Sequence, residues 1–184
     1  TAVAMNQQYS FVGAPNRDFN GTSSGAVFVY ERDGSDNWNE IDVLFASDPS
    51  AGDYFGWFIE VEGDYLMIGA SYKTDDLSGT IDLGAVYVFE SDGSGNWIEV
   101  QKLLPSNPSS STFFGSSIAM EGDKAVIGAY RKDDYTGSAY LFERDGSGNW
   151  NEIEELQASD RASGDRLGYS VDMNGNLIIV GAVY

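Results

Sequence analysis

Short apolar runs separated by polar, glycine-rich turns recur along the chain, and they predict strands rather than helices. In the clearest unit the expected strands cover residues 56–61, 65–70, 84–90 and 97–104. The second and third runs are almost continuously apolar, which is typical of strands covered on both faces. The fourth run alternates apolar and polar positions, as a half-exposed strand does.

Glycine-containing segments separate these runs. Residues 62–64 read Glu-Gly-Asp, and residues 91–96 read Ser-Asp-Gly-Ser-Gly-Asn. Both are hairpin signals, because glycine supplies positive φ angles and Asp or Asn side chains bond to the nearby backbone. Each unit is therefore predicted to hold four antiparallel strands.

The four-strand unit repeats along the chain. Hairpins of nearly identical sequence end at Trp38, Trp97 and Trp150, which are 59 and 53 residues apart. A Gly-Ala pair follows an apolar run in each unit, and an aromatic-Gly pair opens the next. The Gly-Ala pairs are Gly13-Ala14, Gly69-Ala70, Gly128-Ala129 and Gly181-Ala182; the opening pairs are Phe55-Gly56 and Phe114-Gly115, with Leu167-Gly168 as a degraded copy.

A four-strand unit at this period predicts the blades of a β-propeller, each covered by its neighbours. A β-sandwich is the alternative, but it does not explain the recurrence of one unit. The expected fold class is therefore all-β, with three complete four-stranded blades and half of a fourth. The blades are predicted at residues 1–54, 55–113, 114–166 and 167–184 of one propeller domain, which we expect to be an excerpt of a larger ring.

These landmarks resemble the FG-GAP repeat of integrin α-chain propellers and of many microbial surface proteins. In that motif Phe-Gly opens a blade, as the pairs at 55–56 and 114–115 do here, and Gly-Ala-Pro closes its second strand. Only Gly13-Ala14-Pro15 matches the second half in full. The resemblance covers essentially the whole chain. It implies about seven blades in the complete ring, with ligands bound by the loops between strands two and three and between blades.

The resemblance also implies calcium in some members, held by an Asp-rich loop between the first two strands. The corresponding segments here, 6–8, 62–64, 121–123 and 174–176, are too short to wrap an ion that takes 6–8 oxygen ligands. We therefore expect no metal at that site and no other cofactor. The Asp-Gly-Ser-x-Asn segments before each tryptophan lack the spacing of a calcium loop and are interpreted as hairpin turns.

The charge and composition narrow the classes of partner. The net charge is −19, from 29 acidic and 10 basic residues, and such a surface repels nucleic acid and anionic lipids. No apolar run approaches the roughly 20 residues of a membrane helix, so direct membrane insertion is not expected. Histidine and cysteine are absent, which excludes a Ser-His-Asp triad. Nothing marks a pair of carboxylates for glycoside hydrolysis, and the chain is expected not to be an enzyme.

The loops between strands two and three are the candidate binding loops, because variable loops on a rigid scaffold often carry recognition. They share a rim with the inter-blade loops that hold Asp48, Asp53, Asp160 and Asp165. Their carboxylates could bind cations or basic partners, or they could be solvated turns, with Lys73/Asp75 and Arg131/Asp133 as expected charge pairs. The candidate ligand-binding residues are Asp18, Asp75, Asp76, Asp133 and Asp134.

Two further features have a functional and a structural interpretation. The recurring tryptophans could stack on a sugar ring, but their identical placement favours packing of each outer strand against a neighbouring blade. Asn20 begins the one usable N-glycosylation sequon, Asn20-Gly21-Thr22, because Pro108 blocks the sequon at Asn107. Glycosylation at Asn20 is expected only if the protein is secreted from a eukaryotic cell.

These observations favour a non-catalytic binding or adhesion module, extracellular or on the cell surface, that recognises a protein or a glycan through one propeller face. A structural subunit that packs with copies of itself in an extracellular filament or surface assembly is the first alternative. An accessory domain of a secreted enzyme is the second.

Overall fold

The computed structural model describes residues 2–74, 79 and 81–183. Its regular structure is β-strand except for one short turn of helix, α1 (Lys132–Tyr135), and none of the described residues form a helix long and apolar enough to cross a membrane. In chain order the strands are β1 (Val3–Met5), β2 (Tyr9–Gly13), β3 (Val27–Arg32), β4 (Trp38–Leu44), β5 (Phe58–Glu62), β6 (Tyr65–Ala70), β7 (Ala85–Ser91), β8 (Trp97–Leu103), β9 (Ser117–Glu121), β10 (Lys124–Ala129), β11 (Ser138–Arg144), β12 (Trp150–Leu156), β13 (Ser170–Asn174) and β14 (Leu177–Gly181).

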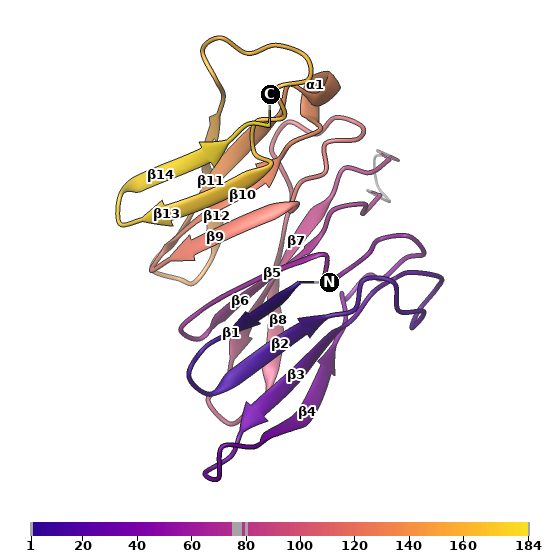
Figure 1. Cartoon of the computed structure of the whole chain (residues 1–184), viewed down its shortest axis with the longest axis vertical. Helices are drawn as coiled ribbons and strands as arrows, with labels where there is room; N and C mark the ends of the chain where they lie inside the picture. Colours follow the sequence, from indigo (N-terminus) through magenta and orange to yellow (C-terminus); the bar gives the residue numbers. More distant parts are fainter. Residues whose placement is uncertain (1, 75–78, 80, 184) are drawn as a thin grey trace.

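The strands form three four-stranded antiparallel sheets and one two-stranded sheet, β1–β4, β5–β8, β9–β12 and β13–β14, each with its strands in sequence order. Figure 1 shows the sheets following one another along the long axis of the molecule. The first strands of successive sheets, β1, β5, β9 and β13, contact one another in turn, as strands around a shared axis do. The predicted all-β fold with propeller-like blades is confirmed.

The observed strand bounds lie within two residues of the expected ones in the second sheet. The largest difference is at its start, where β5 begins at Phe58 rather than at Gly56. Gly56 has a φ angle of 89°, and the N–H of Trp57 donates to the carbonyl of Tyr54 at 3.1 Å. A tight turn therefore occupies the position where the sequence predicts the first residues of the strand.

The apolar core consists of two clusters, and each is shared between neighbouring sheets. In the first, Phe11 and Val29 of the first sheet pack with Phe55 and Tyr87 of the second. The second cluster joins the second and third sheets in the same way. Each cluster therefore covers the facing surfaces of two neighbouring sheets, which is how stacked repeats bury surface that one sheet cannot bury alone.

The glycines of the two repeat landmarks meet between sheets. A Cβ atom added at Gly13 would lie well under 3 Å from the carbonyl oxygen of Gly56, the glycine that opens the next sheet. The same holds for Gly69 against Gly115 and for Gly128 against Gly168. The close approach explains why a glycine precedes the alanine in each repeat: any side chain there would push adjacent blades apart.

The tryptophans that begin β8 and β12 also join neighbouring sheets. Trp97 lies edge-on to Tyr9 and Phe11 of the first sheet, with ring centroids 5.6 and 5.0 Å apart. Trp150 lies edge-on to Tyr65 of the second sheet at 6.1 Å. Trp38, which begins β4 in the first sheet, is 40% exposed. Trp97 and Trp150 are therefore placed to pack their outer strand against the preceding sheet.

Candidate binding face

The loops between the second and third strand of each sheet, together with the linkers between sheets, lie at one end of the blades, which we call the loop face. In Figure 1 the loop after β2 projects to the right, while short hairpin turns lie at the opposite end. Asp18, Asp133 and Asp134 lie on the loop face. Asp75 and Asp76 lie outside the described residues.

Asp18 closes its own loop. One of its carboxylate oxygens accepts a hydrogen bond from the N–H of Ser23 at 2.8 Å. Asn20, which begins the sequon, is exposed, and its N–H donates to the hydroxyl of Ser24 at 3.1 Å. This arrangement matches the turn interpretation of Asp18, because Asp side chains commonly bond to the backbone of their own turn.

The loop after β10 has an unusual backbone. Asp133, Asp134 and Tyr135 have φ angles of 49°, 57° and 61°, a left-handed conformation that is costly for residues other than glycine. Asp133 pairs with Arg161 at 3.0 Å, and Asp134 accepts a hydrogen bond from Ser163 at 2.9 Å. The predicted pairing of Arg131 with Asp133 is therefore wrong, because the following linker supplies the arginine.

The linker carboxylates of the second sheet are occupied by lysines. Lys73 is 1% exposed, and its ammonium lies 3.0 Å from Asp53, which is 2% exposed. The same ammonium donates to the carbonyl of Asp48 at 2.6 Å. Burial raises the pKa of Asp53 despite its hydrogen bond from Lys73. Asp53 is thus part of a buried ion pair and not a rim carboxylate open to cations.

In the third sheet, the buried lysine pairs with a carboxylate on a strand rather than in a linker. Lys132 occupies the repeat position of Lys73, four residues after the Gly of Gly-Ala, and it pairs with Glu155 on β12 at 2.7 Å. Burial opposes ionisation of Glu155, but hydrogen bonds, first from Lys132, lower its pKa to about 2. Asn107 and Thr112 stand where the second sheet has Asp48 and Asp53. In both blades the buried lysine therefore pairs with a carboxylate, which comes from the linker in one blade and from the outer strand in the other.

Six aromatic rings form a continuous series of contacts at the loop face, with the ring in its middle, Phe113, only 1% exposed, and we call this series the aromatic track. Its neighbouring ring centroids lie 4.4–6.0 Å apart, mostly edge to face, which is a favoured geometry for aromatic pairs. The track begins in the linker before β5 and ends just before β13. Its members are Tyr54, Trp57, Tyr72, Phe113, Tyr130 and Tyr169.

The two ends of the track are accessible, with Trp57 41% and Tyr169 53% exposed. Arg131 lies beside its middle, with the guanidinium carbon 4.0 Å from the ring centroid of Phe113. This surface was not predicted from the sequence. A signal was present, since Trp57 and Tyr169 both directly follow a blade-opening glycine, but ring contacts between blades require coordinates.

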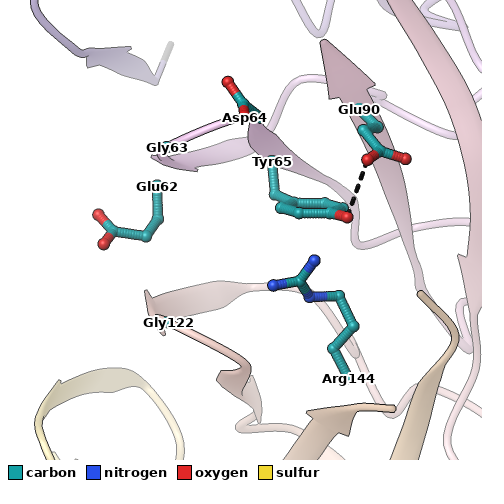
Figure 2. Close-up of a pocket in the computed structure, with 7 residues that line it drawn as sticks. All are labelled: Glu62, Gly63, Asp64, Tyr65, Glu90, Gly122 and Arg144. Carbon is teal, nitrogen blue, oxygen red and sulfur yellow. Dashed lines mark hydrogen bonds between the residues drawn. The ribbon is translucent and has the colours of Figure 1, made fainter. Parts of the chain in front are cut away.

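The opposite end of the blades carries a cavity of about 430 Å³ between the second and third sheets. Figure 2 shows Arg144 lying beneath the Tyr65 ring, 4.0 Å from its centroid, while the Tyr65 hydroxyl donates to Glu90 at 2.9 Å. Arg144 also pairs with Asp123. These contacts hold two blades together and give Arg144 and Glu90 partners within the protein.

The Asp-Gly-Ser-x-Asn segments form hairpin turns. The carboxylate of Asp33 accepts hydrogen bonds from the N–H groups of Ser35 and Asn37 at 2.8 and 3.0 Å. These bonds, that of Asn37 first, lower the pKa of Asp33 to about 2. Asp92 and Asp145 make the same contacts. Among the described residues, no three acidic side chains come together as a metal site would require.

Repeated four-stranded sheets that share their cores and meet glycine to glycine define a propeller-type repeat protein. The sequence model of the FG-GAP repeat family matches residues 38–89, 97–142 and 150–184. The chain belongs to the FG-GAP repeat family.

The solved structure described as "Structure of YjhT" aligns with this chain at 13% sequence identity and a TM-score of 0.43. The alignment covers 88% of this chain and 53% of that one. The chain therefore spans about half the length of the structure that it matches.

Proposed function

We propose that the chain is a non-catalytic binding module of an extracellular or cell-surface protein, and that it recognises a protein or a glycan through the loop face. The observation that carries this proposal is the aromatic track. Its rings extend over three successive blades and are exposed at Trp57 and Tyr169. Aromatic side chains on a rigid support are common anchors of binding surfaces.

The rings of the track are held in place before any ligand arrives. Tyr72 contacts Tyr54, Trp57 and Phe113, with ring centroids 4.8, 5.4 and 4.4 Å away. Tyr54 and Phe113 also have left-handed backbones, with φ angles of 55° and 57°. Rings that are already ordered lose little conformational entropy on binding, which favours affinity.

An extracellular location agrees with three features. The family resemblance includes integrin α chains and microbial surface proteins, the sequon at Asn20 is exposed, and the acidic surface favours solubility over contact with nucleic acid. The same module could stand alone or beside the catalytic domain of a secreted enzyme.

The test compares two tryptophans of equal exposure at opposite ends of the blades. Trp57 is 41% and Trp38 40% exposed, and only Trp57 belongs to the track. The full chain is applied to arrays of glycans and of purified extracellular matrix proteins. We expect Trp57→Ala to weaken binding to the captured probe about 10-fold or more, and Trp38→Ala to change it less than about 2-fold. Equal effects of the two variants would contradict the proposal.

A structural subunit of a surface assembly is the second candidate, favoured by exposed apolar side chains. Leu177 and Ile179 on β14 are 72% and 70% exposed, and Val3 on β1 is 70% exposed. Because these strands belong to the first and last sheets, such patches mark a contact either with another copy of the chain or with the neighbouring blades of the larger ring that we expect. Sedimentation of the purified chain distinguishes the candidates: a monomer at about 100 μM supports the binding module, whereas ordered polymers that dissociate in the double variant Leu177→Ser/Ile179→Ser support the subunit.

A further inference from the structure

Arg131 is an unusual basic residue in a chain of net charge −19. It is partly exposed, and its guanidinium is stacked on two rings, 4.0 Å from the centroid of Phe113 and 4.8 Å from that of Tyr135. Its Nε atom is buried without a hydrogen-bond partner. Within the part of the chain that the structure describes, no carboxylate pairs with Arg131.

Three acidic groups of the same loop and of the following linker make contacts other than to Arg131. Asp133 pairs with Arg161, and Asp134 accepts from the hydroxyl of Ser163. Asp165 accepts a hydrogen bond from the N–H of Ala162 at 2.7 Å. The charge of Arg131 is therefore available to an anionic group of a ligand. Its planar guanidinium can donate two parallel hydrogen bonds to a carboxylate.

The repeat places this arginine where the preceding blade has a ring. Tyr72 and Arg131 both lie three residues after the Gly of a Gly-Ala pair, and each packs on the residue that precedes a blade-opening Phe. Tyr72 packs on Tyr54 at 4.8 Å, and Arg131 packs on Phe113 at 4.0 Å. Successive blades therefore present an aromatic face and then a guanidinium along one surface.

Resting on the proposed function, we infer that the aromatic track binds a glycan chain that carries carboxylate groups. The exposed rings, Trp57 first, pack against the apolar faces of the sugar rings, and the guanidinium of Arg131 binds a sugar carboxylate. A surface built from repeated units suits a ligand with repeated units. A polysaccharide of uronic acids has that form, with one ring and one carboxylate in each unit, and its contact with Arg131 must offset the repulsion between a polyanion and a chain of net charge −19.

The geometry of the rings argues against a cage for an organic cation. The centroids of Tyr54, Trp57 and Tyr72 lie 4.8–6.0 Å from one another. A cation must itself lie within about 6 Å of each ring face, and rings in direct contact leave no space between them. The cluster therefore offers an outer surface rather than an enclosed site.

The experiment measures binding of tetragalacturonate by isothermal titration calorimetry, with the full chain, in 0.15 M salt with EDTA. The carboxyl-reduced tetrasaccharide tests the role of the carboxylates, and tetraglutamate tests an acidic peptide. We expect the wild-type chain to bind tetragalacturonate at least about 10-fold more tightly than either control ligand. Equal binding of the reduced sugar, stronger binding of tetraglutamate, or no detectable binding of tetragalacturonate would overturn the inference.

Variants locate the site. Arg131→Gln should weaken tetragalacturonate binding about 10-fold or more, because a hydrogen bond between charged groups is lost, and Arg131→Lys should restore only part of it, because lysine lacks the planar fork. Arg32→Gln is the matched control, since Arg32 has an exposed ion pair with Asp36 at 2.8 Å at the opposite end of the blades. Thermal unfolding of each variant verifies folding. Equal effects at Arg131 and Arg32 would contradict the assignment.

The outcomes separate this inference from the proposed function. If an array probe binds in a Trp57-dependent manner while tetragalacturonate does not bind, the acidic-glycan inference fails and the binding module stands. If no array probe binds and tetragalacturonate does not bind, both fail.

Discussion

At the scale of single residues, the glycines of the repeat have a specific steric role. Gly69 has an ordinary strand backbone, so the glycine is not needed for its own conformation. It is needed because the carbonyl oxygen of Gly115 in the next blade lies where a Cβ atom would be. The spacing between neighbouring sheets is therefore set by two backbones that nearly touch, and side chains pack around that contact.

Replacing Gly69 with alanine should destabilise the chain strongly. The new methyl group meets backbone on the next blade, which can move only by separating the sheets, and we expect a loss of about 3 kcal/mol or more. Gly34→Ala is the control, because nothing lies within 4 Å of a Cβ atom there. Urea unfolding followed by tryptophan fluorescence measures both, and similar unfolding midpoints for the two variants would refute the steric argument.

A second prediction at this scale concerns pH. Burial first, and then the charges of Asp172 and Glu62, raise the pKa of Glu60 to about 7. Because the folded state binds this proton more tightly than the unfolded state, stability should fall as the pH rises from about 4.5 to about 7.

Glu60→Gln should remove part of the decrease in stability that accompanies the rise in pH. We expect it to stabilise the chain at pH 8 by about 1 kcal/mol, a value reduced for the partial exposure of Glu60. Glu143→Gln removes the same charge from an exposed site and controls for the general relief of repulsion. Unfolding midpoints at pH 5 and pH 8 give the comparison. The explanation is wrong if both variants respond to pH as the wild-type chain does.

At the scale of elements, buried lysines anchor the loops to the strands and linkers. Lys73 links the β6–β7 loop to the linker before β5 through Asp53, while Lys132 links the β10–β11 loop to β12 through Glu155. Both side chains are almost fully buried. A buried charge that loses its partner is costly, so these contacts specify where each loop crosses the end of its blade.

Removing one carboxylate tests this role. Asp53→Ala removes the carboxylate that lies 3.0 Å from the buried ammonium of Lys73, and we expect a loss of about 3 kcal/mol. Asp36→Ala breaks the exposed pair with Arg32, whose partners are 45% and 78% exposed, and should cost less than about 1 kcal/mol. Chemical denaturation measures the difference, and equal losses would show that the buried pair does not stabilise the loop.

The elements were largely predictable from the sequence, because strand patterns and glycine turns are local properties. The strands of the second sheet illustrate this, as does the recurrence of the hairpins that end in tryptophan. Three details were not predictable. The third and fourth strands shift register at the same place in each of the three four-stranded sheets, first between Val29 and Tyr30. In addition, β5 begins after a turn, and residues 133–135 are left-handed. All three depend on contacts between strands or blades.

At the scale of the whole molecule, the stacking of the sheets creates the loop face. The aromatic track exists only because rings from separate blades meet, as Tyr72 meets Phe113 at 4.4 Å. From the sequence, the binding loops were predicted on this rim, but their carboxylates were chosen as the ligand-binding groups. Among the candidate carboxylates that the structure describes, those of Asp18 and Asp133 already have partners within the protein. Acidic residues can be found by composition, whereas a surface shared between blades depends on the fold.

The indole N–H signals of the four tryptophans test the central claim, recognition along the aromatic track, most directly. Trp57 lies on the track, Trp97 and Trp150 are buried between sheets, and Trp38 is at the opposite end of the blades. In a titration of the ¹⁵N-labelled chain with tetragalacturonate, we predict that the Trp57 signal shifts and that the other three stay in place. A shift at Trp38 with none at Trp57 would contradict the account.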